Sequence, residues 1–595
     1  GGAINSLIGS TCYGFIGGGS YNTGSAPNVV VAGGSLNSAA GNCSVVVGGL
    51  SNNTTGEGSS ILGGKLNTGS ASFSTILGGE RNLISNATGS CGGNSFIGVG
   101  FCNSIIGCTH TNVIVGGIYN KISGSLSGSN ALAGCGNFIG GGNNNCIFLV
   151  NCFAKGNFIG GGENNLIQCH IRAGFIGGGG FNKIQSFDGS TKNTPSSFNS
   201  ISSGYFNCII DCNGGTGCNT IGSGRFNRIC QCCIGSHSSW ERGFDNTISG
   251  GYSNLIRTKR CHRGNTIGGG RANVIDYNDG ATVGGGYYNR IYLACTSTQY
   301  QNANTIGGGC NNQIKCSGEK NVIGGGGNNV LCNAKKSGIF GGYENSIICT
   351  SGNICNNFIL GGAQNKICNG FNNVILGGCS NCMCGQYNLA HGRGNCISNT
   401  STCFNLAFGC DIQIGCGDAN VCYNAVFGIN NNVCCCGKFN IVAGCGHNIG
   451  GGSTSNDAQG NAVFGTGNYT CGCFNLMTGI NNTICSSHLY SAILGTYSKT
   501  STACNTTFMC NVCAFGTLSK ASGTFTIDHP NPCKSATHNL HHSFVESPTS
   551  GDNLYRFEVE IGEDLQGEII LPEYYRYLNE NSQVWVNPVD NLGRA

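Results

Sequence analysis

Asparagine, isoleucine and glycine recur in one fixed order along most of this chain. The sequence reads STILGGERNLIS over Ser74–Ser85 and NTIGGGRANVID over Asn265–Asp276. In each copy an apolar residue stands between polar neighbours, glycines follow, and a second asparagine precedes another apolar residue. Such alternation is typical of a short half-buried strand, and glycine takes the positive φ that a tight corner requires. The pattern predicts two short strands and a glycine corner in every copy.

The copies follow one another at a nearly regular step. The first series is spaced by 15 residues and consists of Asn22, Asn37, Asn52, Asn67 and Asn82. About two dozen copies can be counted, and a fixed period of this kind is the signature of a solenoid. Turns stacked about 4.8 Å apart would bury their apolar residues in one column and give a rod on the order of 120 Å long. The repeated asparagines are expected to form a structural ladder of side-chain amides.

The consensus sequence of the repeat changes along the chain, and the repeats end before the C-terminal segment. After Gly394 the copies read NAVFGINNNV or NLMTGINNTI, with one glycine in place of two or three. We therefore expect a β-solenoid over residues 1–394, a second type of solenoid repeat over 395–514 and a small β-rich domain over 515–595. The spacers between copies vary in length, and insertions such as Tyr292–Ala303 are expected to leave the rod as loops on one face.

Composition excludes several other classes of protein. Charged residues are only 9% of the chain, against about 25% in an average soluble protein. Disorder does not fit, because 39% of the residues are hydrophobic and recur in register; collagen does not fit, because glycine is not every third residue and there are only 7 prolines. No apolar run reaches the roughly 18 residues of a membrane span, so no membrane insertion is expected. The chain opens inside a repeat, and we expect its natural start to precede Gly1.

The net charge of +4 is unevenly divided. From Phe515 onward there are 11 acidic and 5 basic residues, so the tail carries −6 and the remainder +10. A charge of +10 spread over more than 500 residues is not the clustered basic face that nucleic-acid binding requires. No nucleic-acid partner is expected.

The tail has its own pattern. Alternation in YRFEVEI (Tyr555–Ile561) and SQVWVNP (Ser582–Pro588) predicts antiparallel strands, and EYYRYLNE (Glu573–Glu580) predicts one or two helical turns. Proximity in sequence does not make a catalytic triad, and the GxSxG elbow is missing. We expect the tail's polar cluster to form hydrogen bonds at strand ends, with self-cleavage as the open alternative; its members are His529, His538, His541, His542, Ser543 and Glu546.

The repeats and the tail together suggest a family resemblance. Turns of the form N-x-x-Φ-G-x-x-N-x-Φ, over about Gly1–Lys520, resemble the β-roll heads of trimeric autotransporter adhesins and the shafts of viral and phage fibres. The segment from TFTIDHP to VWVNPV resembles the region that precedes the intramolecular chaperone of viral fibre proteins. The resemblance implies a homotrimer of left-handed β-rolls with small or apolar residues at its axis, an extracellular or virion-surface location, and self-cleavage after Ala595. Longer insertions and abundant cysteine depart from that family.

The 42 cysteines leave three interpretations open. Pairs six residues apart recur, and one series is spaced by about one turn: Cys316, Cys332, Cys349, Cys368 and Cys384. Stacked turns bring equivalent residues within the 4.4–6.8 Å Cα separation of disulfides, which would indicate an oxidising setting. The cysteines could instead be small buried apolar residues. Thiolate metal sites are the third interpretation, but runs such as CSNCMC (Cys379–Cys384) lack a second knuckle at a matching distance. We expect no metal and no cofactor.

These observations predict a structural fibre or adhesin that binds without turnover. Its expected partners are other copies of the chain and a host-surface glycan or protein, which aromatic residues in the spacers could contact if they do not pack on one another. The first alternative is a polysaccharide-degrading enzyme of the tailspike type, which needs paired carboxylates; the nearest group is Asp211, Glu241, Asp245, Asp276 and Asp279. The second is an ice- or glycan-binding solenoid with threonine after Asn219, Asn246, Asn265 and Asn304.

Overall fold

The chain forms two compact units in the computed structural model, Gly1–Cys510 and Asn511–Ala595. The structure describes residues 3–589 apart from 10, 86–92, 108–109, 125–133, 151–153, 187–195, 212–216, 232–244, 259–263, 293–302, 317–318, 350–354, 417–419, 435, 451–457, 510–511, 514, 516–523, 544–554 and 565.

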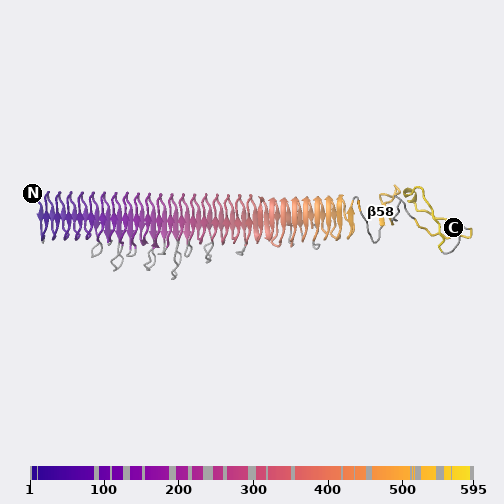
Figure 1. The fold of residues 1–595 in the computed structure, drawn as a ribbon, viewed down its shortest axis with the longest axis horizontal. Coiled ribbons are helices and arrows are strands. Elements are labelled where there is room, and N and C mark those ends of the chain that lie inside the picture. Colours follow the sequence, from indigo (N-terminus) through magenta and orange to yellow (C-terminus); the bar gives the residue numbers. More distant parts are fainter. Residues whose placement is uncertain are drawn as a thin grey trace, which may run out of the picture. The chain divides into compact units, whose positions relative to one another are not determined.

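The first unit is a β-solenoid of about 25 turns, as the repeat predicts. Each turn contributes one short strand to each of two parallel sheets, which we call sheet A and sheet B, and the turns stack side by side (Figure 1). Sheet A runs from β1 (Ser6–Leu7) to β55 (Thr483–Ile484), and sheet B from β2 (Phe15–Ile16) to β57 (Thr507–Met509). Every ladder between turns is parallel, so the backbone hydrogen bonds run along the solenoid axis.

One turn shows how a copy of the sequence repeat folds. Asn157 precedes β18 (Phe158–Ile159) in sheet B, three glycines form the corner, and Asn165 precedes β19 (Leu166–Gln168) in sheet A. Phe158 and Leu166 point outward while Ile159 and Ile167 are fully buried, because side chains alternate across a strand.

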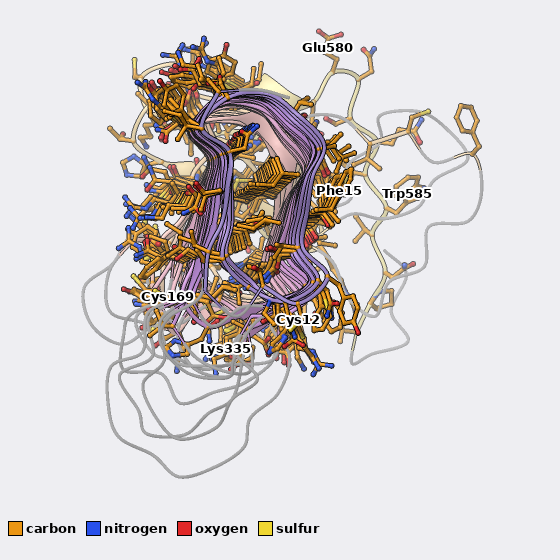
Figure 2. All side chains as sticks on the ribbon, turned by 90° about the vertical axis from the view of Figure 1, so that its left-hand side faces the viewer. Cys12, Phe15, Cys169, Lys335, Glu580 and Trp585 are labelled. Atoms are coloured by element: carbon orange, nitrogen blue, oxygen red, sulfur yellow. A yellow bond between two sulfur atoms is a disulfide. The ribbon has the colours of Figure 1, made fainter. Side chains whose placement is uncertain are left out.

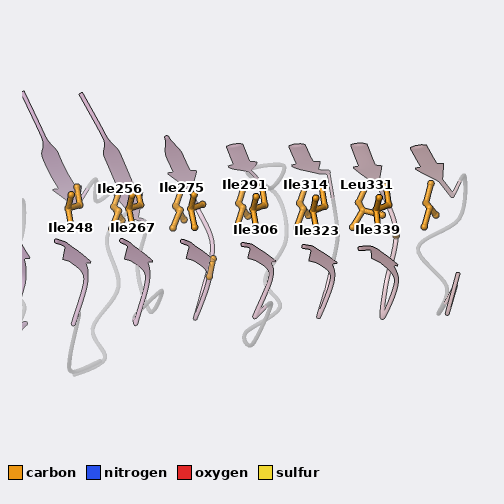
Figure 3. Packing of buried hydrophobic residues seen from close by; sticks show 14 of the residues in the cluster. Ile248, Ile256, Ile267, Ile275, Ile291, Ile306, Ile314, Ile323, Leu331 and Ile339 are labelled. Atoms are coloured by element: carbon orange, nitrogen blue, oxygen red, sulfur yellow. The ribbon is translucent and has the colours of Figure 1, made fainter. Parts of the chain in front are cut away.

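The core is a double row of branched side chains. Residues such as Ile248, Ile267 and Ile306 come from sheet B, and they face a row from sheet A that includes Ile256 and Ile275 (Figure 3). Equivalent isoleucines of successive turns are in register, so each turn buries its apolar pair against the turns above and below. The solenoid therefore has one continuous core along its axis.

The change in the repeat sequence corresponds to a shorter corner between the two strands of a turn. The buried residues of the two strands are eight positions apart in the earlier turns, as in Ile159 and Ile167, and still in Ile375 and Met383. They are seven positions apart from Ala390 and Ile397 onward. Around the same place the strands of sheet B lengthen from two residues in β40 (Phe358–Ile359) to six in β42 (Val374–Cys379) and five in β48 (Ala425–Ile429).

The insertions all interrupt the same connection of the turn. The strands on either side show that each long spacer leaves after a strand of sheet A and returns before a strand of sheet B. The Tyr292–Ala303 spacer, for example, begins at the end of β33 (Arg290–Tyr292) and precedes β34 (Thr305–Ile306). Residues 293–302 themselves lie outside the described residues, as does most of each other insertion.

The second unit is small and differs in part from the expectation. It contains an antiparallel hairpin of β58 (Thr524–Asp528) and β59 (Asn539–Ser543) and a single helical turn, α1 (Tyr575–Leu578), which confirms the helical prediction. The prediction of strands at Tyr555–Ile561 and Ser582–Pro588 is wrong, since these described residues form no strand. Alternation alone does not supply a pairing partner or a core, and Val584, Trp585 and Val586 are 64–80% exposed.

The described residues contain no helix long and apolar enough to cross a bilayer.

Candidate functional site

The predicted asparagine ladder is a set of amides that hold the corners of successive turns. Asn22, Asn37, Asn52, Asn67 and Asn82 are at most 1% exposed. The N–H of each later member donates to Oδ1 of the member one turn before, at 2.9–3.0 Å. The side chains therefore pair with backbone in addition to stacking on one another.

The amide nitrogen of each rung closes the glycine corner. Asn145 Nδ2 donates to the carbonyls of Gly141 at 2.9 Å and Gly162 at 2.9 Å, one in its own turn and one in the next. Gly162 has φ +92°, and a Cβ there would lie 2.0 Å from the carbonyl oxygen of Gly179. The corner therefore needs glycine for its close approach to the next turn as well as for its φ.

One rung of the ladder is a histidine. His447, 1% exposed, takes the position of an asparagine: its N–H donates to Asn431 Oδ1, and its Nδ1 accepts from the N–H of Asn468 at 3.2 Å. Because Nδ1 is the acceptor, the proton lies on Nε2, which is 3.2 Å from the carbonyl of Ala443. Burial lowers the pKa of this imidazole below its ordinary value.

The proposed cysteine column is not one continuous line. Cys332 and Cys368 share a register position with Ile348 between them, whereas Cys316 and Cys349 each lie one residue beyond it. Cys316 and Cys332 nevertheless meet, with Sγ atoms 3.3 Å apart, and burial and this contact raise the pKa of Cys332 to about 11. Cys349 is bonded to Cys355 instead, one of the pairs six residues apart.

Further down the solenoid the thiols gather. Cys382 is in hydrogen-bond contact with Cys368, Cys384 and Cys396, and these contacts lower the pKa of the Cys382 thiol. A second disulfide joins Cys403 to Cys422 across two adjacent turns, with Cα atoms 4.7 Å apart. The part of the chain that the structure describes holds no group of three or more His, Cys, Asp or Glu residues arranged to bind a metal ion.

The two sheets differ sharply in charge. The strands of sheet B include one charged residue, Arg393, at the end of β44 (Leu389–Arg393). The strands of sheet A include nine: Lys121, Lys183, Asp211, Arg228, Arg257, Asp276, Arg290, Lys315 and Lys366. The wall that carries Phe15 accordingly presents mainly carbon atoms, whereas nitrogen atoms gather on the other wall and at the corners (Figure 2).

The outer surface of sheet B is apolar in many turns and carries serine or threonine in others. The residue after the buried position is large and exposed in many turns, as in Val47 (47%), Leu62 (45%) and Phe340 (53%). Phenylalanines 138, 158 and 175 stack on one another at 5.1 and 5.2 Å between ring centroids. We call this outer surface the sheet B face.

The carboxylates considered for catalysis are separated. Asp211 and Asp276 are both buried, and Asp276 forms ion pairs with Arg257 at 3.3 Å and Arg290 at 3.5 Å. Asp211 and Asp276 stand three turns apart, about 14 Å along the axis, beyond the separation used by glycosidases. Asp245 is exposed, Asp279 is partly exposed at another corner, and Glu241 lies outside the described residues.

The histidines of the tail belong to the hairpin. His541 Nδ1 is 2.7 Å from Thr526 Oγ1 across the strand pair, and the N–H of His529 donates to the carbonyl of His538. The side chains of His542 and Ser543, and all of Glu546, lie outside the described residues.

The threonines of the ice-binding alternative are in register on sheet B. The column contains Thr220, Thr247, Thr266, Thr282 and Thr305. Residues on its two ends are Ser200 and Val322, so the column covers five turns.

Sequence reasoning missed a ladder of arginine and tyrosine. The residue that follows the last glycine of the corner is Tyr205, Arg225, Tyr252, Arg271 and Tyr287 in five consecutive turns. Their spacing in the sequence varies from 16 to 27 residues, which hides the register. Counting from the last glycine of each copy would have revealed it.

Neither a family model nor a curated protein matches this chain.

Proposed function

We propose that this chain is the rod of a homotrimeric fibre, displayed outside a cell or on a virion, that attaches to a host surface without turnover. The observation that carries the proposal is the sheet B face, whose described strands contain no charged residue except Arg393 over about 25 turns and which is apolar in many of those turns. Contiguous exposed apolar patches, such as those of its apolar turns, indicate a protein–protein interface.

A second copy of the chain is the partner that fits this face. A partner must present an equally long uncharged surface with the same spacing between rungs, and another sheet B meets both conditions. Three copies packed through sheet B would leave the nine charged positions of sheet A facing solvent or the interior of their own turn.

The second unit supports the same assembly. Its described residues include no buried apolar side chain, and Ile570 and Trp585 are 87% and 72% exposed. A small unit whose described residues bury no apolar side chain gains little stability from packing within one chain. Association with the same unit of other copies would supply the missing burial.

Sedimentation equilibrium tests the assembly. We expect the wild-type protein to have three times its chain mass of 61.1 kDa. The double variant Leu62→Glu/Leu77→Glu places charges on the sheet B face and is expected to dissociate into monomers with an unchanged circular dichroism spectrum. The matched control, Leu83→Glu/Leu166→Glu on the outer side of sheet A, should remain trimeric. A monomeric wild type, or dissociation of both variants alike, would rule out assembly through sheet B.

A further inference from the structure

The arginine–tyrosine ladder lies at the glycine corner, across the turn from the insertions. It consists of Tyr205, Arg225, Tyr252, Arg271 and Tyr287, one residue per turn and paired in register. Arg225 Cζ lies 5.3 Å from the centre of the Tyr205 ring, and Arg271 Cζ lies 5.5 Å from that of Tyr252. These contacts hold the guanidinium groups along the ladder.

The arginines of the ladder keep their charge available. Both are exposed, and no ion pair found among the described residues includes either of them. Asp276, an acidic strand residue of these turns, belongs to sheet A and pairs with two other arginines, Arg257 and Arg290. The same column carries glutamate in earlier turns, at Glu80 and Glu163, but no acid between Tyr205 and Tyr287.

The surface beside the ladder is hollowed. An open hollow of about 500 Å³ is lined by Gly251, Tyr252, Gly270, Arg271 and Tyr287. The glycines leave bare peptide as its floor, and Tyr252 and Tyr287 are 43% and 51% exposed. Because the hollow is open along the surface, it suits a ligand that lies across it and contacts the tyrosine side chains and the exposed arginine.

The spacing of the ladder favours an extended polymer. Arg225 and Arg271 are two turns apart, about 10 Å along the axis, which is comparable to the length of one disaccharide unit. Guanidinium groups bind carboxylates through two parallel hydrogen bonds, and tyrosine offers both an apolar ring and a hydroxyl. We propose that the ladder binds an acidic polysaccharide lengthwise, with sugar carboxylates on Arg225 and Arg271 and sugar rings over the tyrosines and the glycine floor.

This inference deepens the attachment part of the proposed function and rests on it. The probe is polygalacturonate, a carboxylate polymer, with neutral dextran as the reference, measured by biolayer interferometry on the full-length protein. We expect wild type to bind polygalacturonate and not dextran, and Arg225→Gln/Arg271→Gln to raise the Kd at least about tenfold. Arg81→Gln/Arg172→Gln removes the same charge from exposed arginines outside the ladder and should change the Kd less than twofold.

The ladder is not the site if wild type does not bind, or if both double variants lose binding equally, since the second result indicates diffuse attraction to the net charge. Sedimentation of the same samples separates the two proposals. If the protein is trimeric and does not bind polygalacturonate, this inference alone is wrong. If it is monomeric and binds polygalacturonate, the proposed trimer is wrong and the ladder remains a binding site.

Discussion

At the scale of single residues, the asparagine side chains link neighbouring turns through hydrogen bonds. The side chain of each rung satisfies backbone groups of its own turn and of the turn after, and the N–H of each rung donates to the side chain of the rung before. This explains why asparagine recurs where serine or threonine would satisfy fewer groups: only a primary amide offers an acceptor and two donors from one short side chain.

Replacement of one rung should cost stability out of proportion to its size. Asn145→Ala leaves the carbonyls of Gly141 and Gly162 without their amide donor and the N–H of Asn165 without its acceptor. We expect the free energy of unfolding to fall by about 3 kcal/mol and hydrogen exchange at the Asn165 amide to accelerate. Asn143→Ala, at an exposed position two residues away, should change either quantity little. Equal effects of the two substitutions would contradict the stabilising role of the Asn145 side chain between turns.

The histidine rung should make one corner sensitive to pH. Its imidazole is neutral in the fold, and its pKa is lowered from 6.5 by burial. The unfolded chain therefore binds a proton more readily, so the stabilising contribution is complete above pH 6.5 and is lost as the pH falls from there toward the lowered pKa. We expect hydrogen exchange at the Asn468 amide, corrected for its intrinsic rate, to accelerate between pH 7.5 and 5.5.

The His447→Asn variant is the control for that experiment. It restores an amide rung, so its Asn468 amide should show the same corrected protection at both pH values. A pH effect of equal size in this variant would place the sensitivity elsewhere.

At the scale of elements, the unit of construction is the whole turn. In the described solenoid a strand of sheet B is followed by a strand of sheet A, except at the end, where β56 (Ala492–Tyr497) is followed by β57. Each strand pairs only with its equivalents one turn away. Deletion of residues 67–81 removes β9 (Thr68–Gly69) and β10 (Thr75–Ile76) and lets β7 (Asn53–Thr54) pair with β11 (Leu83–Ser85). We expect this variant to remain folded and resistant to proteolysis.

Removal of half a turn is the matched comparison. Deletion of 67–74 removes β9 alone and puts Thr75–Ile76 into the path of sheet A, which interrupts both ladders. We expect trypsin to cut this variant near the deletion, at Lys65 or Arg81. Resistance of the half-turn variant equal to that of the whole-turn variant would show that the turns are not independent units.

The same distinction explains what the sequence could predict. Ile159, Ile167 and the asparagines before them repeat at constant offsets, so strands, corner and core could be assigned without a structure. The ladder from Tyr205 to Tyr287 also lies at a constant place in each copy, but its residue type alternates between tyrosine and arginine, so it does not stand out as a repeated letter and is found only by aligning the copies on their last glycine. In the tail, Tyr555–Ile561 alternates like a strand but has no repeat to pair with, and pattern alone does not reveal whether a partner is present.

At the scale of the whole molecule, one disulfide among the described residues joins two neighbouring turns, Cys403–Cys422. Cys403–Cys422 closes a loop with a sequence separation of 19, for which chain entropy predicts a stabilisation of about 3 kcal/mol. A reductant should therefore lower the unfolding temperature of the wild-type protein. In the Cys403→Ser/Cys422→Ser variant, which lacks this bond, the reductant should lower the unfolding temperature less. Calorimetry with and without reductant provides the measurement, and peptide mapping under non-reducing conditions identifies the bonds.

The state of these cysteines also bears on location. A fibre outside a cell is expected to carry the bond between Cys403 and Cys422 and to oxidise Cys316 and Cys332, whose Sγ atoms already lie 3.3 Å apart. Complete alkylation of all four residues in protein isolated without reductant would contradict an extracellular or virion-surface location.

The direction of the hydrogen bonds determines how such a rod responds to tension. Because they run along the axis, a pull on its ends loads the bonds between neighbouring turns directly, and the weakest rung opens first. Each released turn of 15 residues pays out about 50 Å of extended chain, so the rod would lengthen in steps while its remaining turns stay intact. The Cys403–Cys422 bond would prevent extension of the residues it encloses. The stacked turns would therefore absorb mechanical work one turn at a time, and the disulfide would limit the total extension.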